Sequence, residues 1–196
     1  MTNWQPIIGY LSIIVIVISL LSINSELIGF AIDSSGSVNI TIMSNTNINF
    51  SISGIDFGSG QVSAGNSSAT IDSIGSVVGG NWTPVSDGFR LENVGNVNVS
   101  LNLKTGKDAS GLIGGTNASY QYNVTERESG SCSLGAITLG EWNNVNTSGI
   151  GTKICDVFPF SPGYDEIDVD IKLVIPPDAT AGAQSDIVTA TATAIS

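Results

Sequence analysis

The stretch DEIDVDIKLVIPP, residues 165–177, decides the fold class of this chain. Its apolar residues Ile167, Val169, Ile171 and Leu173 alternate with polar ones, so in an extended chain they lie on one face. An alternation with period two predicts a half-buried β-strand rather than a helix. The two prolines that follow mark a turn at its end.

Other stretches repeat this pattern, separated by turns rich in Gly, Asn and Ser. In SVNITIMSNTNINFSIS (37–53), one face carries Val38, Ile40 and Ile42, and then Ile48, Phe50 and Ile52. GIDFGSGQVSAGNSS (54–68) is typical of a turn, a strand and a turn. Further strands are expected in GFRLENVGNVNVSLNLKTG (88–106), SYQYNVTERE (119–128) and SDIVTATATAIS (185–196). Many short strands between turns favour an all-β sandwich, either jelly-roll or Ig-like.

The composition excludes several classes of function. The 196 residues carry a net charge of −11, which repels nucleic acid and anionic membranes. The chain has no histidine, so a Ser-His-Asp triad is impossible and the commonest metal ligand is missing. A Gly-rich phosphate loop with a lysine is also missing. We therefore expect a protein that is not an enzyme and has no metal or other cofactor.

Two groups of side chains could bind a ligand. Asp165, Glu166, Asp168 and Asp170 cluster on the strand quoted above, but their spacing matches no calcium loop. We expect them to form a solvated face opposite the apolar one. Two tryptophans, Trp82 and Trp142, and the tyrosines could form a sugar-binding platform, although such residues more often pack in the core or at its rim.

The cysteines and the glycosylation sequons both favour an extracellular domain. Cys132 and Cys155 occur without a CxxC motif, which favours a structural disulfide over a metal site, with two buried free thiols as the alternative. Eight Asn-x-Ser/Thr sequons are candidate glycosylation sites, and among them Asn49, in the middle of a strand, is expected to be unused. The eight begin at Asn39, Asn49, Asn66, Asn81, Asn98, Asn117, Asn123 and Asn146.

The N-terminal stretch QPIIGYLSIIVIVISLLSI (5–23) is the chain's one good helix candidate, extending to about residue 32. At about 1.5 Å per residue this helix is long enough to span a bilayer core. The first basic residue is Arg90, so the basic region of a cleavable signal is missing and a retained segment is favoured. GFA at residues 29–31 could serve as a cleavage site, so a removed signal stays an alternative. We expect a hydrophobic helix over 1–32 and a β domain over 33–196.

QPIIGYLSIIVIVIS resembles the N-terminal helix of archaeal type IV pilins, with Pro6 and Gly9 at the matching positions. This resemblance implies a helix that is held in the membrane and is then extracted to pack in a filament core. It implies no catalytic residues.

IDFGSGQVSAGNS, LENVGNVNVSLNL and VIPPDATAGAQSDIVTATATA resemble secreted archaeal surface proteins and, more distantly, bacterial biofilm-fibre sandwiches of the camelysin kind. That second resemblance implies subunits that lose a signal peptide and donate an N-terminal strand to a neighbour. Here SVNITIMSN would be the donor.

Three functions follow as expectations. The first is a structural subunit of an extracellular archaeal pilus-like filament, inserted in the membrane before it assembles with copies of itself. In that filament the hydrophobic helices form the core and the glycosylated β domains form the outer surface. The second is a donor-strand-complemented fibre subunit with the N-terminal segment cleaved. The third is a membrane-anchored, non-polymerising module that binds sugars or other cells and surfaces.

Overall fold

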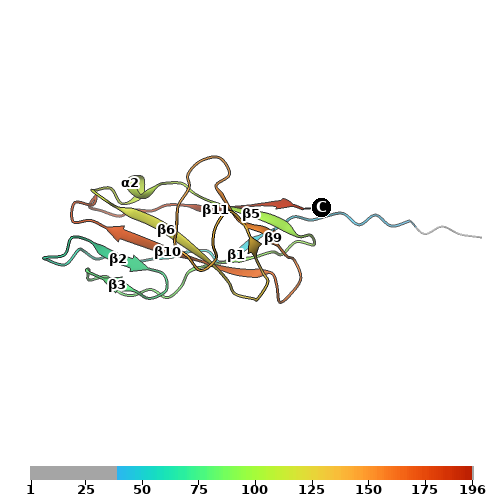
Figure 1. Ribbon diagram of the computed structural model, residues 1–196, viewed down its shortest axis with the longest axis horizontal. Helices are drawn as coiled ribbons and strands as arrows, with labels where there is room; N and C mark the ends of the chain where they lie inside the picture. The colour runs from blue at the N-terminus through green and yellow to red at the C-terminus, as the bar shows by residue number, and fades with distance from the viewer. Residues whose placement is uncertain (1–38, 196) are drawn as a thin grey trace, which may run out of the picture. The chain divides into compact units, whose positions relative to one another are not determined.

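A computed structural model describes residues 39–195, and within them the regular secondary structure is β-strand apart from one short helix (Figure 1). The residues from Met43 onward form one compact unit. The all-β prediction is therefore confirmed for the described residues. The expected N-terminal helix, its motif residues Pro6 and Gly9, and the boundary at residues 32/33 lie outside them.

The larger of two antiparallel sheets is organised around its longest strand, β10. On one side β10 pairs with β6, which in turn pairs with β8. On the other side the first half of β10 pairs with β4 and the second half with β2, followed outward by β1 and β3 respectively. The strands are β1 (Asn49–Ile52), β2 (Ala69–Asp72), β3 (Val77–Val78), β4 (Phe89–Glu92), β6 (Ser119–Glu126), β8 (Asn143–Asn144) and β10 (Glu166–Ile175).

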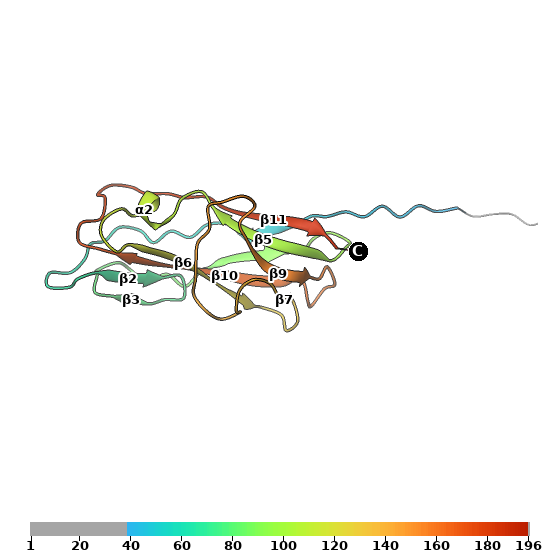
Figure 2. The same ribbon diagram turned by 45° about the horizontal axis from the view of Figure 1, so that its top comes forward.

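The smaller sheet has four strands in the order β11-β5-β9-β7, again antiparallel. Its strands are β5 (Val99–Thr105), β7 (Ser133–Leu134), β9 (Thr152–Phe158) and β11 (Val188–Ala194). Figure 2 shows β11 and β5 of this sheet above β6 and β10. Between β5 and β6 lies the one-turn helix α2 (Ala109–Leu112), whose first turn is capped by the Asp108 side chain.

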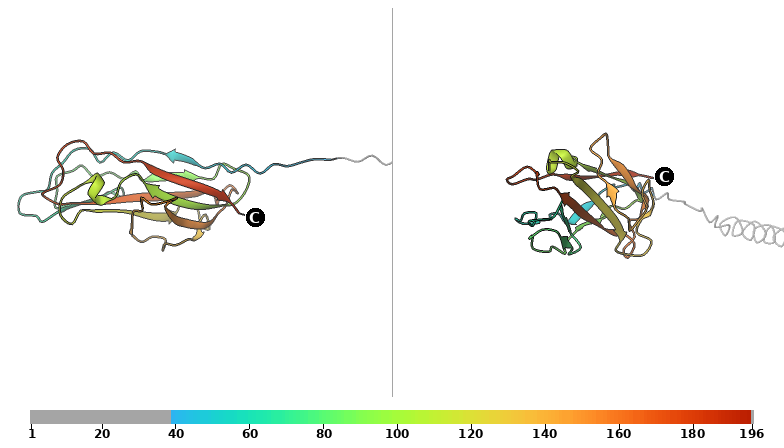
Figure 3. Two further views of the ribbon diagram at one scale, coloured as in Figure 1. Left: turned by 90° about the horizontal axis from the view of Figure 1, so that it is seen from above. Right: turned by 60° about the vertical axis from the view of Figure 1, so that its left-hand side comes forward.

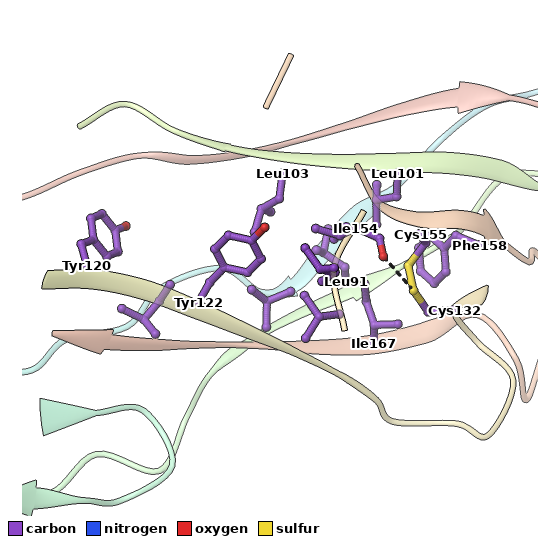
Figure 4. Packing of buried hydrophobic residues seen from close by; sticks show 14 of the residues in the cluster. Leu91, Leu101, Leu103, Tyr120, Tyr122, Cys132, Ile154, Cys155, Phe158 and Ile167 are labelled. Carbon is purple, nitrogen blue, oxygen red and sulfur yellow. Dashed lines mark hydrogen bonds between the residues drawn. A yellow bond between two sulfur atoms is a disulfide. The ribbon is translucent and has the colours of Figure 1, made fainter. Parts of the chain in front are cut away.

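The core lies between the two sheets, as Figure 4 shows. From β10 it receives Ile167, Val169 and Ile171, each 4% exposed or less, which confirms the apolar face expected from the alternation. Leu101 of β5 and Tyr122 of β6 pack into the same cluster. Burial of apolar surface at about 25 cal/mol per Å² is the main force that holds the sheets together.

One buried asparagine ties the end of β4 to the end of β9. The Nδ2 atom of Asn93 donates to the carbonyl oxygens of Val97 (3.1 Å) and Phe158 (3.0 Å), and its Oδ1 accepts from the Gly95 N–H (3.1 Å). Its side chain is only 1% exposed. Asn93 therefore fixes the turn between β4 and β5, at the place where the chain passes from the larger sheet to the smaller.

The strand expected across residues 37–53 is correct only in its second half. Residues 49–52 form β1, but residues 39–48 form no strand and pair with none of the described strands. Ile40 and Ile42 are both 81% exposed instead of lying on a buried face. An alternating segment without a ladder partner and a covering layer gains too little to hold a strand conformation.

Candidate functional site

A groove of about 1170 Å³ opens between the two loops 55–66 and 176–186 of the β domain. Both loops are rich in Gly, Ser and Ala, and neither forms a strand beyond a single bridge at Val62. The groove continues to Val188, the first residue of β11. The groove is therefore bounded by the segment that follows β1 and by the segment that precedes β11.

The floor of the groove is apolar. Phe89 of β4 and Ile171 and Leu173 of β10 contribute to it, together with Leu112 of α2. Tyr120 of β6 also lines the groove, and burial, followed by the nearby Asp186 carboxylate, raises the pKa of its phenol. Most of the side chains of this floor are therefore apolar or aromatic.

The rim of the groove is polar and carries no positive charge. Asp56, Gln61 and Asn66 lie on one loop, and Gln184 and Asp186 lie on the other. Among the described residues that line the groove none is Lys or Arg. The charged side chains of the rim are therefore carboxylates, and its other polar groups are uncharged.

The two described tryptophans do not come together as a sugar-binding platform. Trp82 lines the groove, and its ring lies so close to Gly60 and Gly80 that a Cβ at either glycine would lie within 3 Å of ring atoms. Trp142 receives the Lys172 ammonium 4.5 Å from its ring centroid instead. Both rings therefore pack against their own chain, Trp82 at the groove and Trp142 beneath a lysine of β10.

The acidic residues of β10 are not a uniformly solvated face, and this corrects the sequence-based expectation. Asp168 pairs with Arg90 (3.0 Å) and Arg127 (3.5 Å), and Glu166 pairs with Arg127 (3.0 Å). Asp170 is only 8% exposed and accepts a hydrogen bond from the Ser73 hydroxyl at 2.8 Å. The strands beside β10 bring these partners together, which the spacing within one strand does not reveal.

Two of these carboxyl groups have a raised pKa. For Asp170 the chief cause is burial, with the neighbouring Asp168 and Asp72 charges adding to it and the Ser73 hydrogen bond opposing it. For Asp165 the causes are burial and then the Glu128 charge. Glu128 itself accepts from the backbone N–H groups of Asp165 (2.8 Å) and Glu166 (3.2 Å). Within the described residues, no group of His, Cys, Asp and Glu is arranged to hold a metal ion.

Cys132 and Cys155 form the expected disulfide, with their Cα atoms 5.2 Å apart. Cys155 belongs to β9, and Cys132 immediately precedes β7 at the edge of the same sheet. Both residues are almost fully buried, as Figure 4 shows. The bond therefore braces one end of the smaller sheet against the core.

The sequons differ in exposure. Six begin at exposed asparagines: Asn39, Asn49, Asn66, Asn81, Asn98 and Asn117. Asn49, although in a strand, lies on the outermost strand β1 and is exposed. Asn123 on β6 is 8% exposed, and the Nδ2 of the half-buried Asn146 donates to the Thr152 hydroxyl at 3.3 Å. In the folded chain, six of the sequon asparagines are therefore exposed enough to carry a glycan, whereas Asn123 and Asn146 are buried or half-buried.

The residues at the N-terminal end of the described chain present unusual apolar surface. Ile40 and Ile42 are 81% exposed and Met43 is 80% exposed. The chain is tied down just after them, since Asn96 donates to the Met43 carbonyl (3.0 Å) and accepts from the Asn45 N–H (2.6 Å). These three apolar side chains therefore lie exposed on a segment that pairs with none of the described strands.

None of the helices within residues 39–195 is long and apolar enough to cross a bilayer. The pilin-like stretch lies before these residues. Comparison with known proteins adds no relative: no family model, no curated protein and no solved structure matches this chain.

Sequence reasoning missed the groove altogether. Loop 55–66 lies in a stretch that the sequence predicts as a turn, a strand and a turn, loop 176–186 begins at a predicted turn, and the apolar residues of β10 in the floor were expected in the core. It also missed Asn93, which is one of many asparagines in the chain. No pattern in the sequence separates that buried side chain from its exposed neighbours Asn96 and Asn98.

Proposed function

We propose that this chain is a structural subunit of an extracellular pilus-like filament, built from copies of itself. The observation that carries the proposal is the exposed apolar surface at Ile40, Ile42 and Met43. These residues join the apolar N-terminal stretch to the compact β domain. Apolar side chains at that junction gain stability when other molecules cover them, as happens in an assembly.

In the favoured arrangement, the helix over residues 5–32 holds the subunit in the membrane and afterwards packs against its copies as the filament core. The β domain, which we assign to the jelly-roll or Ig-like sandwiches, then forms the outer surface with its glycans. Contacts of one copy with the next that do not close into a ring generate a helical filament. The Cys132–Cys155 disulfide fits a location outside the cell, because such bonds persist in oxidising compartments.

Mass spectrometry of filaments sheared from cells tests this proposal. Filaments whose subunits retain the peptide NWQPIIGY, residues 3–10, support a helical core. Deletion of residues 1–33 should then abolish filaments while leaving a folded β domain. Monomers in detergent, from cells that never form filaments, would instead indicate an anchored adhesion module.

A donor-strand fibre is the second candidate, and two observations favour it. The segment around Ile40 and Ile42 alternates like a strand but has no partner among the described strands. The groove between loops 55–66 and 176–186 offers an apolar floor without positive charge. A segment of one copy that enters the groove of the next would bury both surfaces.

The two candidates predict different mature chains. Strand donation requires subunits that begin near Ile32 and fibres that survive deletion of residues 1–33. Replacement of both Ile40 and Ile42 by Asp should abolish such fibres, because two carboxylates cannot be buried on the apolar floor without partners. The matched control, Asn39→Asp with Thr41→Asp, adds the same charge on the alternate face and should leave fibre formation intact.

A further inference from the structure

The two sheets end in strands of very different lengths. Among the described strands, the outermost ones of the larger sheet are β1 with four residues and β3 and β8 with two each. In the smaller sheet, β7 has two residues, whereas β11 at the opposite edge has seven and pairs only with β5. Short edge strands are a common protection against unwanted pairing, and β11 lacks that protection.

Along its outer edge, the backbone of β11 has no partner among the described strands. The carbonyl of Ile187 accepts from the Gly106 N–H (3.0 Å), and the Ile195 N–H donates to the Asn98 carbonyl (3.1 Å). In an antiparallel ladder the groups of alternate residues point the same way, so the odd-numbered residues face β5. The N–H and C=O groups of residues 188, 190, 192 and 194 therefore point away from the sheet.

The side chains of β11 carry none of the features that repel another strand. Its sequence, VTATATA, has no charge and no proline, in a chain whose net charge is −11. Val188, Ala190 and Ala192 pack against the core, so Thr189, Thr191 and Thr193 lie on the outer face. Threonines opposite one another on paired strands interact favourably, and no like charges meet when two such strands approach. Figure 3 shows β11, in red, beside β5.

We propose that β11 pairs antiparallel with β11 of a second copy of this chain, across a two-fold axis at Thr191. In this register, residue 188 faces residue 194 of the other copy, and 190 faces 192. All the outward groups of both strands then meet partners. The two four-stranded sheets become one continuous sheet of eight. Because the outer edge of β11 is complementary to itself in this register, we take the partner at that edge to be a second copy of the chain.

The contact does not depend on the filament proposal, since it needs only two folded β domains. One strand pair is a small interface, so isolated chains associate weakly. In a row of subunits the same contact is repeated, and the effective concentration at each site is high. Pairing through β11 would therefore join filaments side by side, which is a different contact from the one that builds each filament.

Variants of the full chain in detergent, each with one cysteine added beside the buried Cys132–Cys155 disulfide, test the register, with copper phenanthroline as the oxidant that takes up the two electrons. Thr191 and its counterpart form a non-hydrogen-bonded pair with Cα atoms about 4.5 Å apart, within disulfide range. Thr191→Cys should therefore give covalent dimers on non-reducing gels. Thr189→Cys should not, because four residues of offset separate the two thiols by about 14 Å. A mixture of Thr189→Cys and Thr193→Cys chains should again give dimers.

A charge variant tests the contact without crosslinking. Thr191→Lys places two ammonium groups face to face across the axis and should abolish lateral association of filaments in electron micrographs. Thr193→Lys adds the same charge, but it meets Thr189 of the other copy, so association should persist. Circular dichroism of both variants shows that the fold is kept.

Three results would overturn the proposal. One is equal dimer yield from Thr189→Cys and Thr191→Cys, which indicates random collision. Another is the absence of any Thr191→Cys dimer while filaments still associate laterally. The third is a crosslink between Thr191→Cys chains and Ile40→Cys chains in place of the symmetric one, because the occupant of β11 would then be the N-terminal segment of another copy.

Discussion

Replacement of the buried Asn93 by leucine should destabilise the β domain strongly while keeping the number and the branching of the side-chain heavy atoms. The substitution removes two donated hydrogen bonds, to the carbonyls of Val97 and Phe158, and one accepted from Gly95. Each bond contributes about 1 kcal/mol net, and an orphaned buried carbonyl costs about 1–3 kcal/mol. Phe158 is fully buried, so water does not replace the lost donor there. We expect a loss of about 3 kcal/mol, equivalent to roughly 6–12 °C in Tm for a chain of this size.

Urea unfolding of the full chain in detergent, followed by tryptophan fluorescence, measures this loss. Asn98→Leu is the matched control, since Asn98 is exposed and makes no side-chain hydrogen bond in the described residues. That control should change the free energy of unfolding by less than about 0.5 kcal/mol. Asn93→Asp adds a pH test: the buried carboxylate would face two carbonyl oxygens, so its destabilisation should be greater at pH 7 than at pH 4. A loss below about 1 kcal/mol for Asn93→Leu would refute the role of Asn93 as the tie between β4 and β9.

Three further measurements follow from the geometry. The pKa of the Asp170 carboxyl is raised in the folded chain, so its contribution to stability is present below the pKa of the unfolded chain and is lost as the pH rises through the folded pKa. The stability of Asp170→Asn relative to the parent chain should therefore be greater at pH 7 than at pH 3, as urea titrations at the two pH values would show. Replacing Cys132 and Cys155 by Ser removes a crosslink that spans 23 residues and should cost about 3 kcal/mol, and a reductant should lower the urea midpoint of the parent chain but not that of the double variant. If glycans are attached to the folded chain, peptide mass spectrometry should find them among the six exposed sequons and not at Asn123, and full occupancy at Asn123 would show that modification precedes folding.

The sequence predicts those strands that keep a strict alternation, and it does so for a physical reason. In β10 apolar and polar residues alternate from Glu166 to Leu173, and in β11 Val or Ala alternates with Thr along the whole strand. β9 was missed because Ile154 and Cys155 are adjacent and both buried. The ladder between β5 and β9 shifts register beside them, so the period of two is broken where the core needs both side chains.

Pairing and site geometry could not be predicted in the same way. The residues GFRLENVGNVNVSLNL, 88–103, read as two strands joined by a turn, and β4 and β5 are indeed there. The two strands nevertheless belong to different sheets, since β4 pairs with β10 while β5 pairs with β9 and β11. The groove and the burial of Asp170 also arise from residues that are far apart in the sequence, so neither leaves a local sequence pattern.

The position of β10 in the chain has a consequence for how the protein comes to be folded. β2, β4 and β6 each have a short partner strand of their own, but β10 is the strand that joins them into one sheet, and it begins only at residue 166. In the smaller sheet, β5 pairs with β9 and with β11, which ends at residue 194, so both of its partner strands come later in the chain. A growing chain can therefore complete neither sheet until residues 166–194 have been made. Partner strands this far apart in the sequence make the closure of both sheets slow.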